Sequence, residues 1–134
     1  MEHVISHVEN RTTVLLAADL GLTTDLNGNG TLITLIDLLP EGWSVRAAQV
    51  RRDGTITNGT GTTVVDIGVE GDEDAIVDGL DIEGSGIAWL SPTVVRYDSV
   101  APIAVVARVV TATAAPSAVA GLTIGLDIVK YGLE

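Results

Sequence analysis

Val, Ile and Thr supply 44 of the 134 residues, and this abundance of β-branched side chains limits the possible folds more than any other feature of the sequence. Two heavy atoms on Cβ restrict a side chain in a helix, whereas they pack well on a pleated sheet. We therefore expect an all-β fold. About eight short strands, with turn signals at intervals of about 8–12 residues, predict one β-sandwich of jelly-roll type over residues 1–134.

The expected strands follow runs of apolar residues. Residues 122–131 alternate most regularly, with Leu122, Ile124, Leu126 and Ile128 on one face. Residues 63–69 and 104–113 predict two further strands. The run 31–39 also fits helical spacing, but it is short and lacks a strong N-cap, so we favour a strand buried on both faces.

Residues 43–52 predict a strand with Trp43, Val45, Ala47 and Gln49 on one face. Asp53-Gly54 is a hairpin-type turn signal. Short strands are expected at 86–90 and 94–98, and a short helical turn at 75–82.

Two features predict contacts beyond the single chain. The apolar runs at 31–39 and 102–113 exceed what one small sandwich needs, so we expect self-association, as a homotrimer. Residues 3–9 fit either a first strand or part of an arm. Residues 1–20 are expected to form an N-terminal arm that reaches a neighbour, because the Gly-rich turn at 28–30 separates them from the core.

The net charge of −11, with one lysine beside six arginines, excludes a nucleic-acid partner, which requires a basic surface. No apolar run approaches the roughly 20 residues of a membrane helix, so we expect no membrane partner. The N-terminus also lacks the basic and apolar regions of a signal peptide. These observations predict a soluble protein that is synthesised in a cytoplasm.

Charge is segregated along the chain, since nine of the 18 acidic residues fall between Arg52 and Arg96. The densest part is expected to have no basic residue to pair with; it holds Asp66, Glu70, Asp72, Glu73, Asp74 and Asp78. Three interpretations stay open. The cluster of Glu70, Asp72, Glu73 and Asp74 binds Ca²⁺ or Mg²⁺, or it is a solvated turn in which Asp72 or Asp74 caps a short helix at 75–82, or it docks on a basic partner.

Asp25, Asn27 and Asn29 match the start of a calcium loop, with oxygen ligands at alternate positions followed by Gly30. The twelfth position, where such loops need a bidentate carboxylate, is Ile36. A plain Asn-Gly turn is therefore favoured over a Ca²⁺ site, and no cofactor is expected.

Catalytic arrangements lack their parts, so we do not expect an enzyme. The chain has no cysteine and no nucleophile elbow, and its two histidines, His3 and His7, both lie near the N-terminus. In an extended strand they would stand roughly 13 Å apart, too far to share a metal. Trp43 and Trp89 are expected in the core or as interface anchors, because aromatic side chains are enriched at subunit contacts.

Leu39-Pro40-Glu41-Gly42 between two strands, the acidic segment 66–74, the Thr/Ala/Pro loop 111–121 and a last strand ending near Tyr131 together resemble the head decoration (cement) proteins of tailed bacteriophages. The resemblance implies a β-sandwich, often trimeric, that binds the outer surface of the major capsid protein lattice and stabilises the head. It implies a virion location after synthesis in the host cytoplasm, and no catalytic residues. On this interpretation Trp43, Trp89, Glu70, Asp72 and Asp74 are interface candidates.

The alternative from another class is a receptor- or glycan-binding domain of a tail fibre or baseplate. It would share the all-β trimeric build, and an exposed aromatic row on one face would favour it. The aromatic content of 3% counts against it.

Overall fold

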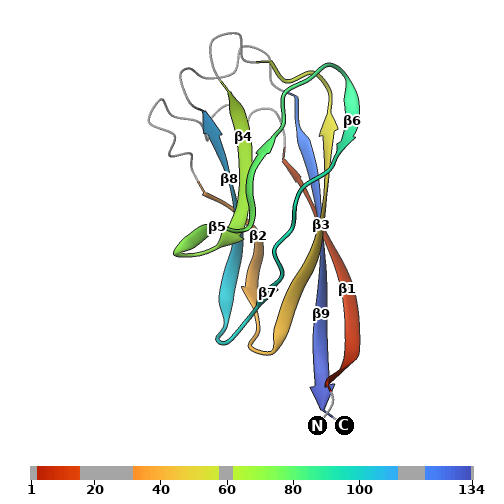
Figure 1. The fold of residues 1–134 in the computed structure, drawn as a ribbon, viewed down its shortest axis with the longest axis vertical. Coiled ribbons are helices and arrows are strands. Elements are labelled where there is room, and N and C mark those ends of the chain that lie inside the picture. Colours follow the sequence, from red (N-terminus) through yellow and green to blue (C-terminus); the bar gives the residue numbers. More distant parts are fainter. Residues whose placement is uncertain (1–2, 16–31, 58–61, 112–119, 134) are drawn as a thin grey trace.

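Two antiparallel sheets pack face to face in the computed structural model, which describes residues 3–15, 32–57, 62–111 and 120–133 (Figure 1). One sheet, named here the β9 sheet, has the strand order β1-β9-β3-β6, and β7 also pairs with β3. Its strands are β1 (His3–Leu15), β3 (Trp43–Asp53), β6 (Ile87–Leu90), β7 (Tyr97–Asp98) and β9 (Leu122–Leu133). The predicted all-β sandwich is confirmed.

The other sheet, named here the β8 sheet, has the order β2-β8-β4-β5. Its strands are β2 (Leu32–Leu39), β4 (Thr63–Val69), β5 (Asp72–Asp81) and β8 (Ile103–Thr111). All strand pairs in both sheets are antiparallel. None of the described residues forms a helix that is long and apolar enough to cross a membrane.

The core lies between the two sheets and draws on both inner faces. β9 contributes Leu122, Ile124, Leu126 and Ile128, all of them buried, which confirms the predicted alternation. Facing them, the β8 sheet contributes Val65, Ile67, Val105, Ala107 and Val109. Burying a side chain of the size of Val, Leu or Ile stabilises a fold by roughly 1.5–3 kcal/mol, so these facing rows hold the sandwich together.

Two predictions of local structure were wrong. Residues 75–82 were expected as a helical turn, but residues 75–81 belong to β5, where Ile76 and Val77 are buried against the other core residues. Residues 32–39 form the expected strand, but it is not buried on both faces. Ile36 and Leu39 are buried, whereas Leu32 and Leu38 are exposed, since β2 is an edge strand.

The predicted face of β3 was wrong beyond Val45. A bulge between Val45 and Ala47 inserts one extra residue against β9 and shifts the alternation. The buried positions after the bulge are Ala48, Val50 and Arg52, so Gln49 lies on the outer face.

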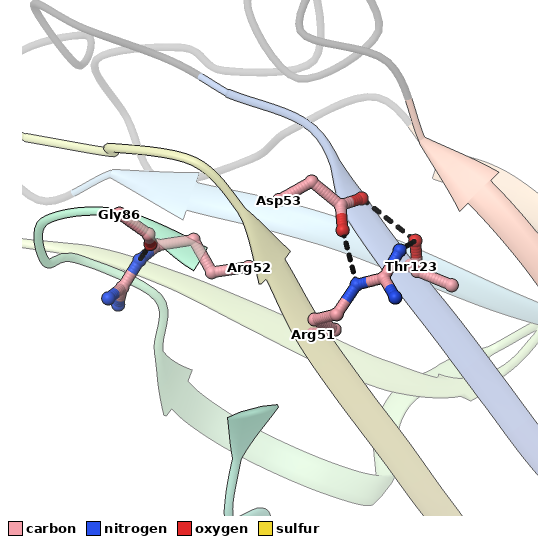
Figure 2. Close-up of polar contacts among 5 residues, drawn as sticks. All are labelled: Arg51, Arg52, Asp53, Gly86 and Thr123. Carbon is pink, nitrogen blue, oxygen red and sulfur yellow. Dashed lines mark hydrogen bonds and ion pairs between the residues drawn. The ribbon is translucent and has the colours of Figure 1, made fainter. Parts of the chain in front are cut away.

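Asp53-Gly54 does not close a hairpin, because β3 and β4 belong to different sheets. Next to Asp53, Arg52 is buried and donates hydrogen bonds to the backbone carbonyls of Gly86 (2.9 Å), Glu83 (3.1 Å) and Ser85 (3.3 Å). Figure 2 shows Arg52 turned toward Gly86, away from the neighbouring Arg51. One buried cation therefore ties the connection that follows β5 to the end of β3.

The N-terminal segment lies at one edge of the β9 sheet. β1 pairs with β9 from His3 opposite Leu133 to Leu15 opposite Leu122. In this structure residues 3–15 are thus an edge strand of their own chain. The arm over residues 1–20 stays a prediction, and residues 16–20 lie outside the described residues.

Candidate functional site

The β4–β5 hairpin carries the acidic segment and projects from the β8 sheet (Figure 1). It turns at Glu70 and Gly71, where Gly71 has φ +86°, a left-handed conformation that favours glycine. The two strands approach closely behind the turn, because a Cβ on Gly68 would lie 2.3 Å from the carbonyl oxygen of Asp72. The interface candidates Glu70, Asp72 and Asp74 are all exposed on this tight hairpin.

The carboxylates of the hairpin interact with one another. The pKa of Asp72 is raised, chiefly by a side-chain hydrogen bond with Asp74, then by desolvation and by the negative charges of Asp74 and Glu73. A helix cap, one of the three interpretations of this cluster, is wrong, because residues 72–81 form a strand.

Asp66 differs from the other acidic residues of this segment, because it has a basic partner. It is buried, and its Oδ2 accepts a hydrogen bond from Arg108 Nη2 at 3.0 Å. Its Oδ1 accepts a second bond from the backbone N–H of Gly79 at 2.8 Å. Asp66 stands directly opposite Arg108 in the β4–β8 pairing, although 42 residues separate them in the sequence. For Asp66, the interpretation of an unpartnered acid was therefore wrong.

The two tryptophans occupy different environments. Trp43 is half-buried and packs against the core. Trp89 lies on β6 with 66% of its surface exposed, and the Arg51 guanidinium stands 5.6 Å from its ring centroid. Their roles as interface anchors stay predictions.

The predicted Ca²⁺ loop with Asp25, Asn27 and Asn29 lies outside the described residues. Within the part of the chain that the structure describes, no group of three or more His, Cys, Asp or Glu side chains is placed to hold a metal ion. Ca²⁺ binding at the loop stays a prediction.

The outer face of the β9 sheet carries a polar network that the sequence interpretation missed. Asn10 Nδ2 donates to Asp127 Oδ1 at 2.7 Å, and Thr12 Oγ1 donates to Asn10 Oδ1 at 2.8 Å. Gln49 Nε2 donates to Asp127 Oδ2 at 3.4 Å. The sequence pattern that could have predicted this polar face is the alternation of Thr123 and Asp127 with the buried apolar residues of β9.

Nearer the end of β3, the same face carries a second set of polar contacts. Arg51 Nε and Asp53 Oδ1 are 2.6 Å apart, and Thr123 Oγ1 donates to Asp53 Oδ2 at 2.8 Å, as Figure 2 shows. Desolvation by burial raises the pKa of Asp53. The hydrogen bonds from Arg51 and Thr123 and the positive charge of Arg51 together outweigh this effect, so the pKa of Asp53 is lowered.

A shallow pocket of about 230 Å³ opens between the two sets of contacts. It is lined by Asn10, Thr12, Gln49, Trp89, Thr123 and Gly125. Four strands of the β9 sheet contribute to it, so only the folded sheet assembles it.

No family model and no curated protein sequence matches the chain. Solved structures do share its fold. A chain in the acid-stable capsid structure of Helicobacter pylori bacteriophage KHP30 matches 99% of this chain over 98% of its own length, with a TM-score of 0.60 and 15% identity. A chain in the capsid asymmetric unit of cyanophage Pam1 matches 93% of this chain over 83% of its own length, with a TM-score of 0.51 and 14% identity. The chain thus has a β-sandwich fold that also occurs in bacteriophage capsids.

Proposed function

We propose that this protein is a bacteriophage head decoration protein that binds the outer surface of the major capsid protein lattice and stabilises the head. The observation that carries the proposal is the end-to-end match of its fold to a chain of a phage capsid. The resemblance of residues 39–42 and 66–74 to cement proteins points the same way. On this proposal the role is mechanical and not enzymatic, and the protein is a virion component made in the host cytoplasm.

Docking on the capsid takes place through the β4–β5 hairpin. Glu70, Asp72 and Asp74 are exposed at its turn. The mutual interaction of Asp72 and Asp74 is unfavourable when both are ionised, and a basic surface on the partner would relieve it. The expected partner surface is therefore a patch of Arg or Lys on the major capsid protein.

Self-association as a trimer is part of the proposal. Leu32 and Leu38 are exposed on β2, which lies at an edge of the β8 sheet. Apolar side chains on an exposed strand edge favour contact with another chain. Association of three copies would also multiply the weak contacts that each acidic hairpin makes with the lattice.

The test is co-sedimentation of the purified protein with phage heads that lack it, beside its molar mass by light scattering. We expect a trimer that sediments with the heads in a fixed ratio to the major capsid protein. The trimer should dissociate from the heads as the salt concentration rises, because salt screens exposed charges within about 8–10 Å. A double variant, Asp72→Asn with Asp74→Asn, should bind more weakly. Asp78→Asn with Asp81→Asn is the matched control, since it removes the same charge from exposed positions of β5 that lie away from the turn.

Binding that is unaffected by both salt and the hairpin variant would contradict docking through the acidic turn. A protein that ignores heads but binds host cells would contradict the decoration role and favour a receptor-binding domain of a tail fibre or baseplate. One observation supports that second candidate, namely the exposed Trp89 beside a polar pocket.

A further inference from the structure

The pocket on the outer face of the β9 sheet has a glycine as its floor. Gly125 lies opposite Thr12 on one side and opposite Gln49 on the other. A Cβ at this position would lie 3.0 Å from Gln49 Oε1 and 3.6 Å from Asn10 Nδ2. The absence of a side chain therefore lets both amide groups settle over the middle of the sheet.

The amides around this floor are held in place before any ligand arrives. Asn10 contacts Asp127 at 2.7 Å, Gln49 at 3.5 Å and Thr12 at 2.8 Å, and Gln49 also contacts Asp127 at 3.4 Å. Each residue comes from a β-strand, and groups on rigid elements lose little freedom when they bind. The pocket thus presents preorganised donors and acceptors side by side.

Trp89 forms the remaining wall. Its indole is largely exposed, and Arg51 packs over the ring at 5.6 Å from the centroid. Arg51 is itself held by Asp53 at 2.6 Å and by Thr123 at 3.3 Å. An exposed aromatic surface beside fixed hydrogen-bonding groups suits a ligand that has one apolar face and a polar rim.

The lining contains no ionisable side chain. The nearest charges already have partners, since Asp127 accepts from the two amides and Arg51 pairs with Asp53. A charged ligand would find no counter-charge, whereas a neutral polyhydroxylated ring matches donors, acceptors and the indole together. A nucleobase would also stack on Trp89, but a net charge of −11 opposes a polyanionic chain.

We propose that this pocket binds one neutral sugar ring of a glycan, with the C–H face of the sugar on Trp89 and its hydroxyl groups on Asn10, Gln49 and Thr12. The pocket of about 230 Å³ suits a single ring and not an extended chain. The proposal does not depend on capsid docking, because the acidic hairpin belongs to the other sheet.

The experiment titrates the whole protein with glucose, galactose, mannose and N-acetylglucosamine in turn, while NMR follows the two indole N–H signals and the side-chain amides. We expect at least one sugar to shift the signals of Trp89, Asn10 and Gln49 together, with saturation at millimolar concentration. Trp89→Ala and Gly125→Ala should each weaken that binding about tenfold or more.

Ile87→Ala is the matched control, because Ile87 is exposed on the same face of β6 but does not line the pocket. It should leave the affinity unchanged. Trp89→Ala changes an exposed side chain, so it keeps the test decisive even if Gly125→Ala fails to fold. Absence of any shift with all four sugars, or binding that survives in Trp89→Ala, would overturn the proposal.

Discussion

The two sheets of this sandwich differ in their balance of positive and negative side chains. The strands of the β9 sheet carry five cations and four carboxylates, in balance; they are Arg11, Arg46, Arg51, Arg52 and Lys130 with Glu9, Asp53, Asp98 and Asp127. The strands of the β8 sheet carry seven carboxylates and one cation; they are Asp37, Asp66, Asp72, Glu73, Asp74, Asp78 and Asp81 with Arg108. Charge that is segregated along the sequence is thus also segregated between the sheets.

This difference separates two kinds of surface. On the β9 sheet, opposite charges meet as close pairs, as in Arg11–Glu9 and Arg51–Asp53, each at 2.6 Å. On the β8 sheet, the single cation contacts the buried Asp66, and the hairpin keeps its negative charge at the surface. The first arrangement suits a neutral ligand, and the second suits a basic partner.

Removing the buried cation of the β9 sheet should have the largest effect. Arg52→Ala leaves the carbonyls of Glu83, Ser85 and Gly86 without their donor, so we expect a loss of about 3 kcal/mol in the free energy of unfolding. Arg51→Ala, which removes a partly exposed cation from the next position, should lose less than about 1 kcal/mol. Urea unfolding measures both. Equal losses would show that burial does not distinguish the two arginines.

Breaking the Asp66–Arg108 pair of the β8 sheet should lower the free energy of unfolding by a smaller amount. Asp66→Ala removes the carboxylate from Arg108 and the acceptor from the Gly79 N–H, and we expect a loss of about 2 kcal/mol. Arg108→Met and the double variant complete a cycle with a coupling energy of about 1 kcal/mol or more. A coupling near zero would mean that the pair does not hold β4 against β8.

The smallest expected effect concerns pH, and its sign differs between the sheets. The hydrogen bonds from Ser44 and Arg96 lower the pKa of Asp98, and the pKa of Asp53 is lowered as well. These carboxylates stabilise the fold above their unfolded pKa, and that stabilisation is lost as the pH falls through the lowered values. The pKa of Asp72 is raised, so its ionised form destabilises the hairpin at neutral pH, and acidification relieves this.

Asp53→Asn should therefore lower stability at pH 7 and have little effect below the lowered pKa. Asp72→Asn should raise stability at pH 7 and have little effect at acid pH. Thermal unfolding of each variant and of the unmodified protein, measured from acid pH to pH 7, checks the direction of both stability changes. Two variants that shift stability in the same direction at pH 7 would break the contrast between the sheets.

Strands with regular alternation were predictable because their pattern depends on burial alone. Residues 122–131 fall in β9 close to the predicted bounds, since the face that carries Leu122, Ile124, Leu126 and Ile128 meets the core. Residues 75–82 were mistaken for a helical turn, because apolar residues in a short segment fit both periods. The bulge after Val45 has no local signal, so the side chains beyond it were assigned to the wrong face.

The functional surfaces were predictable only in part. The acidic hairpin follows directly from the charges at 70–74, which are close in the sequence. The Asp66–Arg108 pair and the pocket around Gly125 join strands distant in the sequence, and their assembly depends on strand order and register. No local pattern specifies which strands become neighbours, so these contacts required the structure.

The position of β9 also sets the order in which the molecule can fold. β9 lies between β1 and β3, yet it is the last of the described strands in the sequence. During synthesis, β1 and β3 must wait for residues 122–133 before either gains its long pairing partner. Contacts of such long sequence separation slow folding, because the intervening chain loses conformational entropy before the strand pairing contributes stabilising free energy. The β8 sheet can assemble first, and the other sheet then closes over it when the final strand arrives.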